Sequence, residues 1–170
     1  MNLKHCIHLS LGLLALQAAA PAAAEADGWT ANLRYRHEAV DDDAFARDAS
    51  ADTLRLRLGW SHALANGFSA GFEGEGVAAL GDRFNSGANG ETAYPAVPDA
   101  RALEINQAWL RWRGERGGGT LGRQRLAFDN HRFVGNVGWR QNEQTFDGLS
   151  ADATLREGLV LRYAWLDRVH

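Results

Sequence analysis

Apolar and polar side chains alternate one by one along most of this chain, and no other feature of the sequence limits the possible fold as much. In residues 29–40 tryptophan, leucine and tyrosine share one face, and arginine, asparagine and glutamate share the other. Successive side chains of a β-strand point to opposite faces, so this period of two predicts a strand. Seven such strands are predicted, at residues 29–40, 53–64, 68–76, 103–113, 120–128, 144–155 and from 159 to the end at 169–170.

The fourth predicted strand changes its parity in the middle. Leu103 and Ile105 share one parity, whereas Ala108, Leu110 and Trp112 share the other. A β-bulge adds one residue to a strand and exchanges its two faces beyond that point. We therefore expect a bulge between Ile105 and Ala108, which would place all five apolar side chains on a single face.

The connections between the predicted strands alternate in length. Short ones lie at 66–67, 114–119 and 156–158, and long ones at 41–52, about 79–101 and about 129–143. Short turns at one end and long loops at the other are typical of an outer-membrane barrel, in which every backbone group must be paired. The predicted fold class is therefore all-β, an antiparallel up-and-down transmembrane β-barrel. A soluble exported β-protein, with its apolar face turned inward, shows the same alternation and remains the alternative.

Residues 1–24 have the organisation of a secretory signal peptide. Lys4 supplies a positive charge, residues 7–16 form a short apolar core, and Ala22, Ala23 and Ala24 follow Pro21 as a cleavage site. We expect export to the bacterial outer membrane and a mature barrel region of residues 25–170. The single cysteine, Cys6, lies in the predicted signal peptide, so the mature chain would contain no disulfide.

Composition excludes several classes of protein. The net charge of −3 and the absence of a basic block argue against nucleic acid as a partner. A mean hydropathy of −0.34 is too low for a bundle of membrane helices. No arrangement of residues suggests a catalytic site, a metal site or a cofactor site, and we expect no enzyme.

Seven strands are an odd number for a bacterial barrel, which has an even number of strands in a single chain. An unpaired strand edge in lipid would leave backbone groups without partners. We therefore expect these residues to be the N-terminal part of a longer barrel. An eight-stranded barrel acting through its loops, as a structural or adhesive protein, is the other interpretation.

The candidate functional residues are arginines on the polar faces of the predicted strands and in the third long connection. They are Arg34, Arg36, Arg55, Arg57, Arg123, Arg125, Arg132 and Arg140. Rows of guanidinium groups along a low-dielectric wall favour anions, and the planar guanidinium matches a carboxylate. These residues are thus candidates for lining a pore for anionic solutes. Acids on the same faces, including Glu38, Glu73, Glu75 and Glu104, could instead pair with them in a structural ladder.

The sequence also resembles a known family. Residues 122–148, with the letters GRQRLAFDNHRFVGNVGWRQNEQTFDG, resemble the signature of the alginate export family of outer-membrane porins. Residues 104–110 and 33–36 resemble that family as well. The resemblance implies a barrel of about eighteen strands with an arginine-lined, anion-selective lumen, which exports a polyuronate in the founding member. It also implies outer-membrane lipid, anionic small solutes or a polyuronate, and the barrel-assembly machinery as partners.

Overall fold

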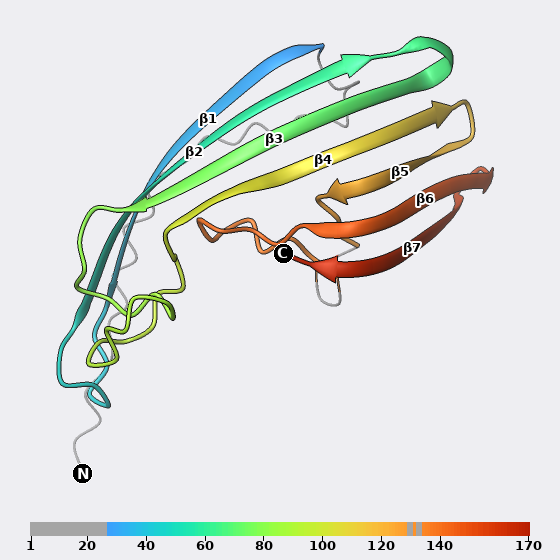
Figure 1. The fold of residues 1–170 in the computed structure, drawn as a ribbon. Helices are drawn as coiled ribbons and strands as arrows, with labels where there is room; N and C mark the ends of the chain where they lie inside the picture. The colour runs from blue at the N-terminus through green and yellow to red at the C-terminus, as the bar shows by residue number, and fades with distance from the viewer. Residues whose placement is uncertain (1–26, 129–130, 132–133) are drawn as a thin grey trace.

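The computed structural model describes residues 27–128, 131 and 134–170, which form a single curved antiparallel sheet (Figure 1). The predicted signal peptide lies outside the described residues. The seven strands are neighbours in chain order, and each pairs antiparallel with the next. They are β1 (Gly28–Val40), β2 (Ala49–Ala63), β3 (Phe68–Ala79), β4 (Ala102–Gly114), β5 (Gly117–Gln124), β6 (Phe146–Arg156) and β7 (Leu159–Val169). The predicted all-β, up-and-down architecture is confirmed.

The sheet is open. No described strand pairs with the outer edge of β1 or with that of β7. The seven strands therefore form part of a barrel wall, which Figure 1 shows curved along its whole length. No helix in the described part of the chain is both long and apolar enough to cross a membrane.

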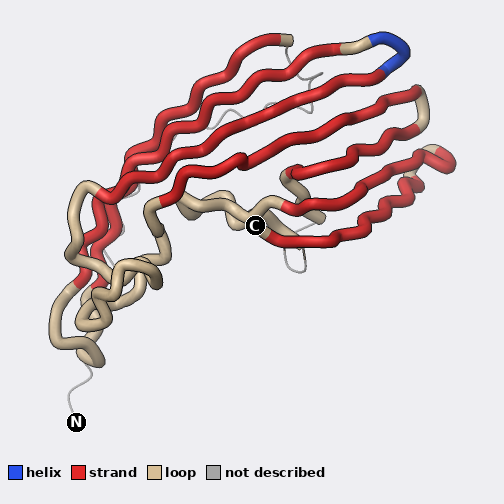
Figure 2. The backbone as a smooth tube through the Cα atoms, in the orientation of Figure 1, coloured by secondary structure: helices blue, strands red, loops and turns tan. Residues whose placement is uncertain are grey.

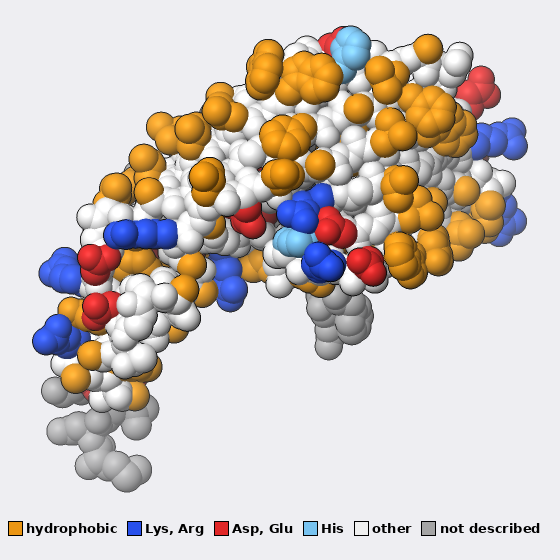
Figure 3. Space-filling view, viewed as in Figure 1, with side chains coloured by type: hydrophobic (Ala, Val, Ile, Leu, Met, Phe, Trp, Pro, Cys, Tyr) orange, Lys and Arg blue, Asp and Glu red, His pale blue; other side chains and the backbone are white. Residues whose placement is uncertain are grey.

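The sheet exposes its apolar side chains on one face and buries its charged side chains on the other, which is the opposite of a soluble protein. Along β2, Arg55 and Arg57 are only 5% and 8% exposed, whereas Leu56 and Leu58 between them are 44% and 51% exposed. Figure 3 shows apolar side chains spread over the convex face. A water-soluble sheet buries its leucines and exposes its arginines, so this distribution is typical of a wall with lipid outside and polar groups inside.

A bulge in β4 keeps the apolar residues of that strand on the convex face. Glu73 of β3 is opposite Gln107, and the next residue, Gly74, is opposite Ile105, so Asn106 is the additional residue. Ile105 and Ala108 are consequently both exposed on the convex face, and Asn106 is buried on the concave face. The predicted bulge is confirmed.

The short and long connections are gathered at opposite ends of the sheet (Figure 2). The β2–β3 turn is a short 3-10 segment, η1 (Ala65–Gly67), and the β4–β5 turn consists of Glu115 and Arg116 alone. Asn66 and Gly67 have φ of 59° and 79°, which an Asn-Gly pair adopts readily in a tight hairpin turn. The alternation of connection lengths is confirmed.

Several strand boundaries differ from the prediction, and those of β2 and β5 have a clear structural reason. β2 begins at Ala49, four residues before Thr53, because Ala49 and Ala51 pack with Phe84, Tyr94 and Val97 of the second long loop. In that loop region the Tyr94 hydroxyl accepts a hydrogen bond from Arg47 at 3.1 Å and raises the pKa of this guanidinium.

β5 occupies residues 117–124 instead of the predicted 120–128. Its first three residues, all glycine, pair with Ala151, Asp152 and Ala153 of β6. After Gln124 the chain leaves the sheet and crosses the concave face, which explains the early end of the strand.

Candidate functional site

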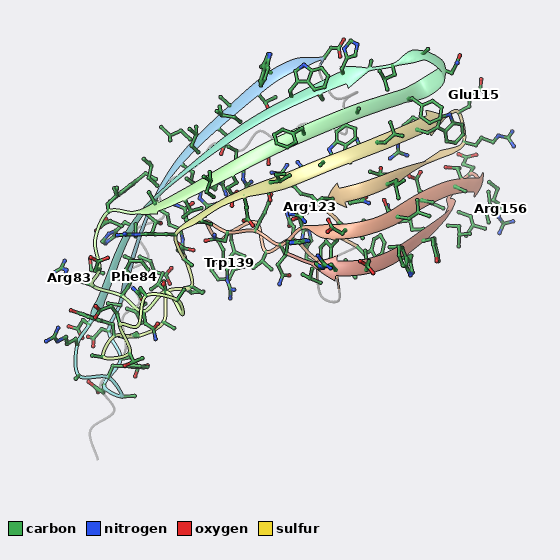
Figure 4. The ribbon with its side chains drawn as sticks, viewed as in Figure 1. Arg83, Phe84, Glu115, Arg123, Trp139 and Arg156 are labelled. Carbon is green, nitrogen blue, oxygen red and sulfur yellow. The ribbon has the colours of Figure 1, made fainter. Side chains whose placement is uncertain are left out.

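The described residues of the third long connection, 125–128, 131 and 134–145, lie against the concave face of the sheet. We call the part from 134 to 145 the inner segment. Its residues make polar contacts with β1, β2 and β4, far away in the sequence. Figure 4 shows Trp139 of this segment on the side towards which the sheet curves. The inner segment and the polar faces of the strands together form the candidate site.

Gln141 anchors the inner segment to the wall. Its side chain is fully buried, and Nε2 donates to the Thr53 carbonyl at 3.1 Å and to the Thr53 hydroxyl at 3.0 Å. The backbone N–H of Gln141 donates to Oδ1 of Asp99 at 3.1 Å. Asp99, which is also fully buried, belongs to the second long loop and forms an ion pair with Arg36. Two long loops and two strands therefore meet at this point.

Glu143 is the centre of a second cluster. Its carboxylate forms an ion pair with Arg125 and lies 3.2 Å from Nη2 of Arg57. The amides of Asn106 and Asn136 donate to it at 2.7 and 3.1 Å. The bulge residue Asn106 also donates to Glu73 at 2.7 Å, and Arg125 pairs with Glu73. The cluster thus connects β2, β3, β4 and the inner segment.

Arg55 and Arg57 lie beneath these contacts, in the wall itself. Arg57 forms an ion pair with the buried Glu75, and Arg55 donates from Nη2 to Asn32 at 2.9 Å. Arg55 Nε, Arg57 Nη2 and Glu75 Oε1 have no hydrogen-bond partner. Buried charged groups with remaining bonding capacity are costly, and the ion pairs of Arg57 with Glu75 and Glu143 offset part of that cost.

Arg34 holds the turn that carries Trp139. It donates from Nη1 to the Gly138 carbonyl at 3.1 Å and from Nη2 to the Trp139 carbonyl. Arg36 and Arg140 both lie over the Trp139 indole, with their Cζ atoms 5.7 and 4.8 Å from its centroid. Two of the predicted arginines therefore lie over the indole of Trp139, and a third holds the backbone beneath it.

Arg123 is placed differently from Arg125. Arg123 is paired across the sheet with Ala108, which is paired with Phe72, which in turn is paired with Trp60. Phe72 and Trp60 are exposed on the convex face. Arg123, which is labelled in Figure 4, lies near the end of β5. It forms a two-pronged ion pair with Asp147, at 2.8 and 3.1 Å. The structure therefore brings Arg125, but not Arg123, into the cluster around Glu143. Arg132 lies outside the described residues.

A cavity of about 1200 Å³ lies between the inner segment and the wall. Its charged lining consists of four guanidinium groups, from Arg34, Arg55, Arg57 and Arg125, against the carboxylates of Glu73 and Glu143. The cavity is consequently lined by an excess of positive charge, and Trp139 and His131 also line it. In the described part of the chain no three His, Cys, Asp or Glu side chains are grouped to hold a metal ion.

The sequence profile of the alginate export family matches residues 29–163, which contain β2 to β6 entirely, all of β1 except its first residue, and the first five residues of β7. The chain belongs to the alginate export family. This confirms the resemblance carried by residues 122–148, which include the inner segment. No curated protein matches the chain. The family consists of outer-membrane transport porins, and the exposed apolar face of this member agrees with that location.

Several residues of the site were not predicted from the sequence of this family member. Gln141, Asp99, Asn106 and Glu143 connect the loops to the wall, yet each is an ordinary polar residue in a polar stretch. The sequence singles out the position of Asn106 alone, because the predicted bulge requires an extra residue at 106 or 107. The other three depend on how the long loops fold back, which the alternation of the strands does not encode.

Proposed function

We propose that this protein is an outer-membrane channel for the passive transport of anionic solutes, including uronate oligomers. The observation that carries the proposal is the excess of guanidinium groups lining the cavity of the concave face. A positively charged lining with low-dielectric walls raises the local concentration of anions and repels cations. A guanidinium also offers two parallel donors to a carboxylate, which suits a uronate better than a spherical ion.

Ion pairs between the lining arginines and nearby carboxylates do not remove the preference for anions. Glu73, Glu75 and Glu143 neutralise part of the charge of Arg57 and Arg125 and leave the four lining guanidinium groups in excess by one, so the structural ladder and the anion pathway coexist in the same residues. The pairs hold the guanidinium groups in place, and the excess positive charge remains for a passing solute. Weak, multiple contacts of this kind allow an anion to enter and also to leave.

The open edges of the sheet suggest how the channel would be completed. We propose that further strands complete the barrel, because the edges of β1 and β7 have no partner among the described residues. The convex apolar face would contact outer-membrane lipid after insertion by the barrel-assembly machinery. Transport of this kind needs neither a catalytic residue nor a cofactor.

Reversal potentials in planar bilayers test the proposal. With a KCl gradient, protein purified from outer membranes should conduct chloride in preference to potassium. Replacing Arg125 by glutamine removes one of the four lining cations, and the permeability ratio of chloride to potassium should fall by about twofold. Arg156→Gln is the matched control, because Arg156 is exposed at the short β6–β7 turn, far from the cavity (Figure 4). A wild-type channel that prefers potassium would contradict the proposal.

A further inference from the structure

Two large aromatic side chains, Trp139 and Phe146, are among the described residues that line the cavity; Phe146 is buried, whereas Trp139 is unusually accessible. It lines the cavity and remains 59% exposed, although the segment that carries it is anchored by the fully buried Gln141 two residues later. Trp109, another tryptophan of the concave side, is buried against Gly71. An exposed indole on a firmly held backbone contributes little to the packing of the wall.

The backbone beneath Trp139 is fixed from the strand side. Arg34 of β1 donates to the carbonyls of Gly138 and Trp139, and Gln141 Nε2 donates to the Arg34 carbonyl at 3.4 Å. These contacts hold the turn without covering the indole. A side chain fixed in its bound position loses little conformational entropy when a ligand binds.

Two further guanidinium groups surround the ring. Arg140 and Arg36 lie over the indole at 4.8 and 5.7 Å, and more than half of the Trp139 side chain stays exposed beside them. Such contacts hold the planar cations beside the aromatic surface. Arg36 is already paired with Asp99 and Glu38, so the exposed part of the indole lies beside one guanidinium group, that of Arg140, which matches a carboxylate.

We propose that Trp139 is a stacking platform for one ring of a carboxylated sugar, with Arg140 positioned to bind its carboxylate. A pyranose presents a face of C–H groups, which packs against an aromatic ring, and a uronate carries its carboxylate at the ring edge. A small inorganic anion has no such face and would gain nothing from the indole. The inference rests on the proposed function and adds a subsite for sugar rings to the general attraction of anions.

Block of the chloride current by uronate oligomers tests this subsite. An oligouronate that binds in the cavity interrupts the current of single channels purified from outer membranes and inserted in planar bilayers. Trp139→Ala should raise the half-blocking concentration about tenfold, and Trp139→Phe, which keeps a ring, should raise it by less than about threefold. Trp165→Ala is the matched control, because Trp165 of β7 is 55% exposed on the convex face and should leave the block unchanged.

A neutral oligosaccharide of the same length separates stacking from charge. Trp139→Ala should weaken block by both sugars, whereas Arg140→Gln should weaken block by the uronate only. An unchanged half-blocking concentration in Trp139→Ala, with the wild-type ion selectivity retained, would overturn the subsite and leave the channel proposal standing. A channel without anion selectivity whose block by uronate still depends on Trp139 would support the subsite and contradict the channel proposal.

Discussion

Gly71 and Gly76 both lie in β3, but only one of them is required for packing. A Cβ atom built on Gly71 would overlap the ring of Trp109, which is buried on the concave face. A Cβ atom on Gly76 would meet only the Cδ1 atom of Leu103, at 3.8 Å, an ordinary contact. The glycine at 71 therefore provides the space that the indole occupies in the wall.

We expect Gly71→Ala to lower the free energy of unfolding by about 1–3 kcal/mol, because Trp109 must move out of a filled space. Gly76→Ala should change it by less than about 0.5 kcal/mol. Urea unfolding of the protein in detergent micelles, followed by tryptophan fluorescence, measures both values. Equal effects of the two substitutions would show that Trp109 does not occupy the space above Gly71.

Gln141 supplies the second prediction at this scale. Its amide donates to both oxygens of Thr53, and alanine would leave these buried acceptors without that donor. We expect Gln141→Ala to cost about 1–3 kcal/mol and to loosen the inner segment, so that trypsin cleaves after Arg140 more rapidly. Asn142→Ala is the neighbouring control, since the Asn142 Oδ1 atom accepts no hydrogen bond. Equal cleavage rates in the two variants would refute the anchoring role.

At the scale of elements, the alternation of side chains was sufficient to predict every strand. It even predicted the bulge in β4, because Ile105 and Ala108 could share a face only if one residue were added between them. It did not predict that β2 begins at Ala49, since alanine at 49 and 51 gives little contrast in polarity. The glycines that open β5 likewise predict a turn, because glycine carries no side chain that could show the alternation of a strand.

The candidate site was predictable only in part for a related reason. Alternation correctly placed Arg34, Arg55 and Arg57 on the polar face, where they line the cavity. Arg123 differs from this expectation. At the end of β5 it is paired with Ala108, whose neighbours across the sheet belong to the convex face. The anchoring role of Gln141 arises from a long loop, whose path depends on contacts between distant residues.

The convex face gives a prediction for β2 as an element. Leu58 lies near the middle of the strand and is 51% exposed. In a soluble protein Leu58→Arg would be harmless, but in a membrane barrel it places a charge in lipid, at a cost of about 2–4 kcal/mol near the midplane. We expect this variant to be reduced in the outer-membrane fraction, whereas Leu58→Ile should be recovered normally. Normal recovery of Leu58→Arg would favour the soluble alternative.

At the scale of the whole molecule, one curved sheet separates two environments. The outside carries many exposed apolar side chains over the strands (Figure 3). The inside contains a connected set of charged and polar groups from β2, β3, β4 and the inner segment. The charges hold the inner segment in place, and that segment in turn forms one side of the cavity. The arrangement thus makes the wall and the lining of the proposed channel from the same residues.

Accessibility of single cysteines in intact outer membranes tests this separation most directly. Cys6 is replaced by serine, and a cysteine is introduced either at Leu58, on the convex face, or at Thr30, which lines the cavity. A charged thiol reagent that cannot cross lipid should label Thr30→Cys and not Leu58→Cys. A lipid-dissolved quencher should quench a fluorophore attached at position 58, after labelling in detergent and reconstitution, and not one at position 30. The reverse pattern would contradict the assignment of the two faces and, with it, the channel.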